Sequence, residues 1–127
     1  MEGIKFIHEH LNKMKSIQMK LLDLIEDEDE NSANLSNVLE YLKDQKIRED
    51  KFQFKEILHL LSRISNNHHR NAAFFNDFEK ILLEFSDDIK NYFSNFEIFD
   101  IFRKNKRILL FLFEEKILIP ENSFFLF

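Results

Sequence analysis

Several residue types that build β-rich, disulfide-bonded or thiolate-metal folds are scarce or missing in this chain of 127 residues. Cysteine is absent, which excludes a disulfide framework and a thiolate-ligated metal site. Glycine and proline occur once each, as Gly3 and Pro120, although tight turns, bulges and hairpins need many of both. These shortages disfavour a β-rich fold and predict helices that are joined by polar loops.

Long apolar stretches are also absent. The longest apolar run, ILLFLF at 108–113, is far shorter than the ~20 residues that a membrane-spanning helix needs. Residues 1–25 are charged throughout and do not contain the uninterrupted apolar core of a signal peptide. We therefore expect a soluble, intracellular protein of the cytoplasm that has no membrane partner.

Apolar residues recur with helical spacing along most of the chain. The first such stretch, 4–25, places Ile4, Ile7 and Leu11 on one face, and Gln18 interrupts that face. It could be a coiled-coil strand, but the polar interruption favours a helix that packs on its own domain. Further helices are predicted over about 33–46, 51–65, 73–85, 86–93, 97–103 and 106–116.

The predicted fold class is therefore all-α. We expect one domain over 1–120, with about six helices arranged as antiparallel helical hairpins, the last of which covers 97–116. Residues 121–127 form an apolar tail that ends in SFFLF. Such a terminal cluster either docks on the domain, is exposed as an interaction surface, or indicates a fragment of a longer protein. Docking or a fragment is favoured over a dedicated ligand motif.

The five histidines are the first residues to consider for metal binding or acid–base chemistry. His68 and His69 are adjacent in the stretch SNNHHRN, so their side chains diverge, and a polar loop is the better interpretation. His8 and His10 do not have the spacing of the His-Glu-x-x-His signature, and His59 lies beside an apolar stripe. No phosphate-binding glycine loop or nucleophile elbow is present. We expect no metal, no cofactor and no enzymatic activity.

One basic cluster stands out, and it consists of Arg103, Lys104, Lys106 and Arg107. It could bind phosphate groups or nucleic acid. Alternatively, Arg103 and Lys104 stabilise the end of one helix, where the helix dipole favours cations. Lys106 and Arg107 begin the next helix, where the dipole disfavours them, so we expect tertiary partners such as Glu97 or Asp100. The net charge of −5 argues against bulk nucleic-acid binding.

Four stretches together resemble a known family, and they are KMKSIQMKLLDLIEDED (13–29), DQKIRED (44–50), ISNNHHR (64–70) and DDIKNYFSNFEIFDIFRKNKRILLFLFEEKILIP (87–120). The family is a helical domain of unknown function that precedes the repeats in protist (trichomonad-type) ankyrin-repeat proteins. The resemblance covers nearly the whole chain, to about Pro120. It implies that NNHHR is a habitual loop of the family, with no catalytic role.

The last hairpin also resembles an ankyrin unit. Residues 106–116 are similar to the second helix of a repeat, in which an NKxIVxLLLExG pattern is common. Lys116-Ile117 stands where that pattern has Lys-Gly, and the missing glycine makes the unit divergent. The resemblance therefore implies an ankyrin-like or α-solenoid-like carboxyl-terminal part, although no regular array of ~33-residue repeats begins within the chain.

The leading function prediction is a non-catalytic protein–protein interaction or capping module of an ankyrin-repeat-type protein. Its partner would be another protein or adjacent ankyrin repeats, which would bind the apolar surface near 106–127. The candidate interface residues are Ile108, Leu109, Leu112, Phe124 and Phe125, and a core role for the first three is equally consistent.

Two alternatives stay open. One is a basic patch at 103–107 that binds phosphate-bearing ligands or nucleic acid, which predicts a steep loss of binding as salt rises. The other is a metal enzyme that depends on His68, which predicts stabilisation by zinc. The oligomeric state, the partner and the process served are left open by the sequence.

Overall fold

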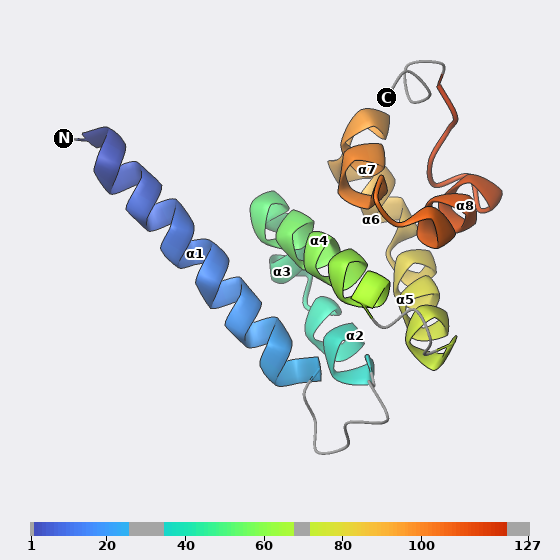
Figure 1. Cartoon of the computed structure of the whole chain (residues 1–127), viewed down its shortest axis with the longest axis horizontal. Coiled ribbons are helices and arrows are strands. Elements are labelled where there is room, and N and C mark those ends of the chain that lie inside the picture. The colour runs from blue at the N-terminus through green and yellow to red at the C-terminus, as the bar shows by residue number, and fades with distance from the viewer. Residues whose placement is uncertain (1, 26–34, 68–71, 122–127) are drawn as a thin grey trace.

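The computed structural model describes residues 2–25, 35–67 and 72–121, which form an assembly of helices (Figure 1). Across these three ranges there are eight helices and no strand, so the all-α prediction is confirmed. The helices are α1 (Glu2–Ile25), α2 (Ser36–Leu42), α3 (Gln45–Glu49), α4 (Lys51–Asn67), α5 (Ala72–Glu84), α6 (Ser86–Tyr92), α7 (Asn95–Phe102) and α8 (Lys106–Glu114). The described ranges thus hold more helices than the six or so that we expected.

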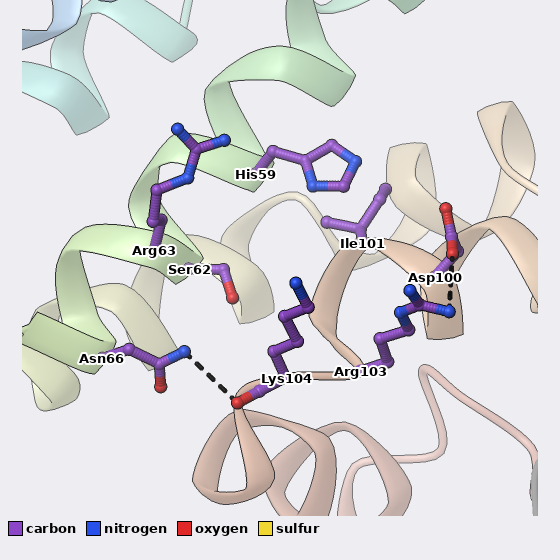
Figure 2. Close-up of a pocket in the computed structure, with 8 residues that line it drawn as sticks. All are labelled: His59, Ser62, Arg63, Asn66, Asp100, Ile101, Arg103 and Lys104. Atoms are coloured by element: carbon purple, nitrogen blue, oxygen red, sulfur yellow. Dashed lines mark hydrogen bonds and ion pairs between the residues drawn. The ribbon is translucent and has the colours of Figure 1, made fainter. Parts of the chain in front are cut away.

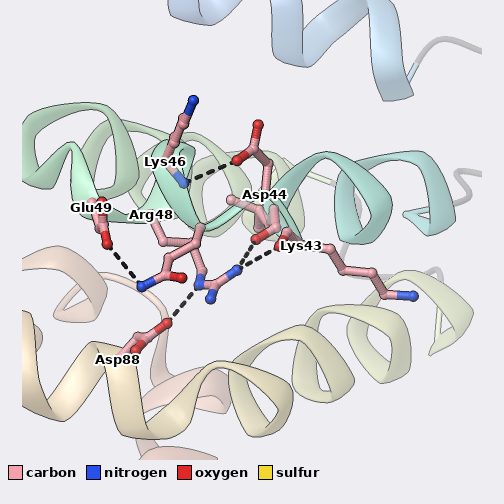
Figure 3. Close-up of polar contacts among 8 residues, drawn as sticks. Lys43, Asp44, Lys46, Arg48, Glu49 and Asp88 are labelled. Carbon is pink, nitrogen blue, oxygen red and sulfur yellow. Dashed lines mark hydrogen bonds and ion pairs between the residues drawn. The ribbon is translucent and has the colours of Figure 1, made fainter.

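Part of this difference arises because the helix predicted over 33–46 is broken into α2 and α3. The break lies at Asp44, whose backbone is extended and whose side chain accepts a hydrogen bond from the Lys46 N–H to cap α3. The Arg48 guanidinium then donates to the carbonyl oxygens of Leu42 (2.6 Å) and Lys43 (3.0 Å) at the end of α2 (Figure 3). A side chain from α3 therefore satisfies the backbone groups that the break leaves unpaired.

α7 begins at Asn95, two residues before the predicted start, because Ser94 caps it. The Ser94 side chain accepts from the Glu97 N–H, and the Glu97 carboxylate accepts from the Ser94 N–H, which forms a capping box. The Ser94 backbone bond lowers the pKa of Glu97 below its ordinary value. This local motif orients the helix that carries one wall of the pocket described below.

α4 lies at the centre of the packing and contacts α1, α3, α5 and α7. The core around it is rich in phenylalanine: Phe54 packs 5.7 Å from Phe93, and Phe78 packs 6.1 Å from Phe102, between ring centroids. All four rings are buried. Full burial of such a side chain contributes about 2–3 kcal/mol, so this aromatic core is a large part of what holds α4 through α7 together.

α8 ends in a left-handed turn although no glycine is present. Lys116 has a φ of 58°, its N–H donates to the Phe113 carbonyl, and the Ile117 N–H donates to the Leu112 carbonyl. These two bonds form the Schellman motif that usually ends on glycine. Ile117 and Leu118 are buried directly after it. The turn that we associated with a missing glycine is thus made by a lysine.

The segment after α8 returns to the start of α7. The Asn95 side chain accepts from the Ile119 N–H (2.9 Å) and donates to the Ile119 carbonyl (2.7 Å) and to the Glu121 carboxylate (2.8 Å). The Asn95 side chain therefore satisfies both the N–H and the carbonyl of Ile119, and these bonds hold residues 117–121 against the domain.

Candidate functional site

The residues predicted as a carboxyl-terminal interface divide into three groups. Ile108 and Leu112 have no exposed surface and belong to the hydrophobic core. Leu109 is half-buried against that core. Phe124 and Phe125 lie outside the described residues. Ile108 and Leu112 therefore have the core role that the sequence analysis left open for them.

Other apolar side chains on α8 and the segment after it are exposed. Leu110 is 62 % exposed and Ile119 is 64 % exposed. Phe96, on α7 next to the Asn95 that binds Ile119, is 54 % exposed. These positions were not among the predicted interface residues, because periodicity shows which face is apolar but does not show which part of it is covered.

The four basic residues at 103–107 are all exposed, and they have different neighbours in the structure. The Arg107 guanidinium lies 4.1 Å from the centroid of the Phe75 ring, which is a close cation–π contact. Asp100, which we expected as a partner of Lys106 or Arg107, lies instead 3.8 Å from Arg103 on the preceding turn. The other predicted partner, Glu97, instead contacts Lys51 at 3.3 Å. Arg107 therefore packs on an aromatic ring, whereas Arg103 pairs with a carboxylate, so the two ends of the cluster have different neighbours.

Arg103 and Lys104 line a pocket of about 240 Å³ between α4 and the end of α7, which we call the α4–α7 pocket (Figure 2). Figure 2 shows Lys104 extending from the end of α7 toward the side chains of α4. The Asn66 side chain closes one edge by donating to the Lys104 carbonyl (3.2 Å). The pocket is lined by His59, Ser62, Arg63, Asn66, Asp100, Ile101, Arg103 and Lys104.

The wall that α4 contributes is held in place by the start of α8. The Asn105 side chain donates to the Ser62 carbonyl (3.2 Å) and to the Ser65 hydroxyl (2.6 Å), and it accepts from the Ile108 N–H (3.2 Å). Asn105 is only 2 % exposed. It therefore caps α8 and at the same time joins α8 to α4, directly beside Lys104.

Of the histidines, His59 is the one that the structure places in this pocket. It is half-buried on α4, and burial is the main reason why its pKa is lowered from the ordinary 6.5. His10 lies against aromatic rings, 6.4 Å from Phe6 and 4.8 Å from Phe52. His68 and His69 lie outside the described residues. Within the ranges that are described, there is no group of three or more side chains that could hold a metal ion.

The amino-terminal half of α1 carries an exposed apolar face that the sequence analysis expected to be packed. Ile4 is 56 % exposed, Ile7 58 % and Leu11 49 %, whereas Ile17 and Leu21 farther along the helix are buried. Figure 1 shows the start of α1 extending beyond the first turn of α4. The apolar side chains that α1 buries against the domain therefore lie in its second half. We call Ile4, Ile7 and Leu11 the α1 stripe.

A groove of about 310 Å³ lies on the other side of the same half-helix, between α1 and the first turn of α4. The Lys13 ammonium group lies 4.9 Å from the Phe52 ring centroid and 3.6 Å from the Asp50 carboxylate, so these contacts bind α1 to α4. The groove is lined by Phe6, Glu9, His10, Lys13 and Phe52.

Comparison with known proteins gives no match: no protein-family model, no curated protein and no solved structure matches this chain. The resemblance to the domain that precedes ankyrin repeats thus stays a prediction. None of the helices in the described ranges is both long and apolar enough to cross a membrane.

Proposed function

We propose that this chain is a non-catalytic protein–protein interaction module and that its main partner surface is the α1 stripe. The observation that carries the proposal is that Ile4, Ile7 and Leu11, spaced three and four residues apart on one helix, are each about half exposed. Apolar side chains that share one helix face are the usual anchors of a helix in a partner's groove.

The charges around the α1 stripe favour an acidic partner. Between Ile4 and Lys20 the helix has four lysines and one glutamate, and one of these lysines, Lys13, already contacts Asp50 at 3.6 Å. His8 and Lys15 follow Ile4 and Leu11 by one helical turn, so they border the stripe, and both are exposed. The partner that fits is an amphipathic helix of another protein whose apolar face is bordered by acidic residues.

A second copy of the same helix is a poorer fit. In a symmetric pair of α1 helices the two copies of Lys15, which borders the stripe, would lie at the same interface, and like charges at such positions are destabilising. The size of the surface also matters. Burying the exposed half of three aliphatic side chains contributes about 1 kcal/mol each, which suits a weak, reversible complex.

The resemblance suggests a different partner surface, on the carboxyl-terminal hairpin, where adjacent ankyrin repeats would dock in a solenoid-like stack. Such docking would use exposed side chains such as Leu110 and Ile119, since Ile108 and Leu112 are already buried in this chain. The α1 stripe is the stronger candidate because its three exposed residues are contiguous on one face.

The test uses the whole chain and a synthetic helix-forming peptide with leucines at i, i+3 and i+7 and glutamates beside them. Binding is measured by fluorescence polarisation. Ile7→Ser and Leu11→Ser should each weaken binding about fivefold, because each removes about 1 kcal/mol of apolar burial. Met19→Ser is the matched control, since Met19 is exposed on the same helix outside the stripe, and it should bind as the wild type does.

Three results would overturn the proposal. Equal binding of a peptide with lysines in place of the glutamates would remove the charge argument. A dimer in size-exclusion chromatography with light scattering, if Ile7→Ser abolishes it, would show that a second copy of this chain binds the α1 stripe. Tighter binding to vesicles of anionic lipid than to the acidic peptide would make the stripe a membrane contact.

A further inference from the structure

The α4–α7 pocket contains a cluster of cations that come from two distant parts of the sequence. Arg63 belongs to α4, whereas Arg103 and Lys104 lie at the end of α7, and all three are exposed. The one carboxylate among the lining residues, Asp100, lies 3.8 Å from Arg103. The lining therefore contains three permanent positive charges and one negative charge, which leaves the pocket electropositive.

Neutral hydrogen-bonding groups complete the lining. Ser62 supplies a hydroxyl group from α4, and its residue is 5 % exposed. Asn66 supplies an amide whose nitrogen already donates to the Lys104 carbonyl (3.2 Å). Ile101 is buried and contributes an apolar part of the wall. Guanidinium, ammonium and hydroxyl groups that line one small concave site are the kinds of donor that recognise a phosphate group.

The geometry points to a binding site for a phosphate monoester in the α4–α7 pocket, with Arg63, Arg103 and Lys104 as its charged contacts. This inference does not depend on the proposed role of the α1 stripe, because the two share no residue. It also differs from a basic patch over 103–107, since it includes Arg63 and omits Lys106 and Arg107.

A single phosphate group fits the pocket better than a polyanion does. Nucleic acid needs a row of cations along its backbone. The basic residues after Asn105 do not continue the row, because Arg107 lies on the Phe75 ring at 4.1 Å and Lys106 is outside the pocket lining. Asp100 at the rim would repel further phosphates. The volume of about 240 Å³ holds one phosphate and a small attached group.

The first measurement is a titration of the whole chain with inorganic phosphate, followed by amide chemical shifts, against sodium chloride of equal ionic strength. Shift changes are expected at 62–66 and 100–104. Lys104→Gln and Arg63→Gln should each raise the dissociation constant about tenfold, because each removes a charge-assisted contact. Lys106→Gln is the matched control, an exposed lysine two residues from Lys104, and should leave the constant unchanged. Equal constants for Lys104→Gln and Lys106→Gln would overturn the inference.

Three further ligands show which kind of molecule carries the phosphate group that the pocket binds. Glycerol phosphate stands for a small metabolite, and a phosphoserine peptide stands for a phosphorylated protein. Tighter binding of either one, still dependent on Arg63, supports the inference and names the source. A short single-stranded oligonucleotide that binds more tightly than both, and loses affinity in Lys106→Gln as much as in Lys104→Gln, would overturn it.

Discussion

The Asn105 side-chain nitrogen lies 2.6 Å from the Ser65 hydroxyl oxygen, and this hydrogen bond joins two residues that are 40 positions apart in the sequence. Ser65 has no exposed surface, and its hydroxyl in turn donates to the Ser62 carbonyl at 2.8 Å. The same asparagine caps α8. A polar network thus joins α4 to the start of α8, and all the buried side-chain nitrogen and oxygen atoms of the described residues have partners.

The first prediction concerns this network. Asn105→Ala should lower the free energy of unfolding by about 2–3 kcal/mol, since it removes a helix cap and two buried tertiary hydrogen bonds. Urea unfolding followed by circular dichroism measures this value. Ser94→Ala is the matched control: Ser94 caps α7 at an exposed position, so its loss should cost only about 1 kcal/mol. Equal losses in the two variants would show that the bonds to α4 contribute nothing.

A second prediction concerns the turn after α8. Lys116→Gly should raise the free energy of unfolding by about 1 kcal/mol, because glycine adopts a φ of 58° without the steric penalty that a lysine side chain carries. Glu115→Gly is the control, since Glu115 has a φ of −86° and gains nothing from glycine. It should be slightly destabilising. A stabilising Glu115→Gly together with a neutral Lys116→Gly would contradict the argument.

Arg48 and Asp88 provide a third prediction. Figure 3 shows their ion pair, which measures 2.6 Å. The two side chains are 15 % and 28 % exposed, and the Arg48 guanidinium also lies 4.8 Å from the Phe85 ring centroid. Arg48→Lys should cost about 2 kcal/mol, because one ammonium group cannot serve the carboxylate, two backbone carbonyls and the ring together. Thermal and urea unfolding of the two proteins would measure the difference.

The exposed pair of Glu40 and Lys43 is the control for that substitution. It has a similar distance, 2.8 Å, but both side chains are more than half exposed. Lys43→Gln should therefore leave the stability almost unchanged. If Lys43→Gln were as destabilising as Arg48→Lys, the bridging role of Arg48 between α2, α3 and α6 would be refuted.

A fourth prediction concerns His59 and pH. Burial lowers the pKa of His59 below 6.5; nearby Lys55 and Arg63 lower it further, and Glu56 and Asp100 act in the opposite direction. The folded protein therefore binds this proton less tightly than the unfolded chain does. The stabilisation is complete above pH 6.5 and is lost as the pH falls through the lowered pKa.

Two measurements test the fourth prediction. A proton NMR titration of the His59 ring should give a pKa below 6.5. The unfolding free energy of the wild type should also fall more steeply than that of His59→Gln when the pH is lowered below 6.5. Parallel curves for the two proteins would mean that His59 titrates alike in the folded and unfolded states.

Helix positions were largely predictable, and the candidate sites were not. The apolar spacing placed α1, α4, α5 and α8 to within a few residues, because periodicity within one helix is a local property of the sequence. The break at Asp44 was missed, since Arg48 supplies the partners that make the break stable. The predicted basic cluster contributes Arg103 and Lys104 to the pocket, but nothing in the local pattern indicated Arg63.

The sequence by itself determined that this chain is helical and which face of each helix is apolar. Only the tertiary structure decided what covers those faces: Ile4 and Ile7 share the spacing pattern of α1 with the buried Leu21, yet they are exposed, while Ile108 is buried. The physical reason is that helical periodicity arises within a single element, whereas burial depends on which other element packs against it. The α1 stripe and the α4–α7 pocket are both consequences of that packing.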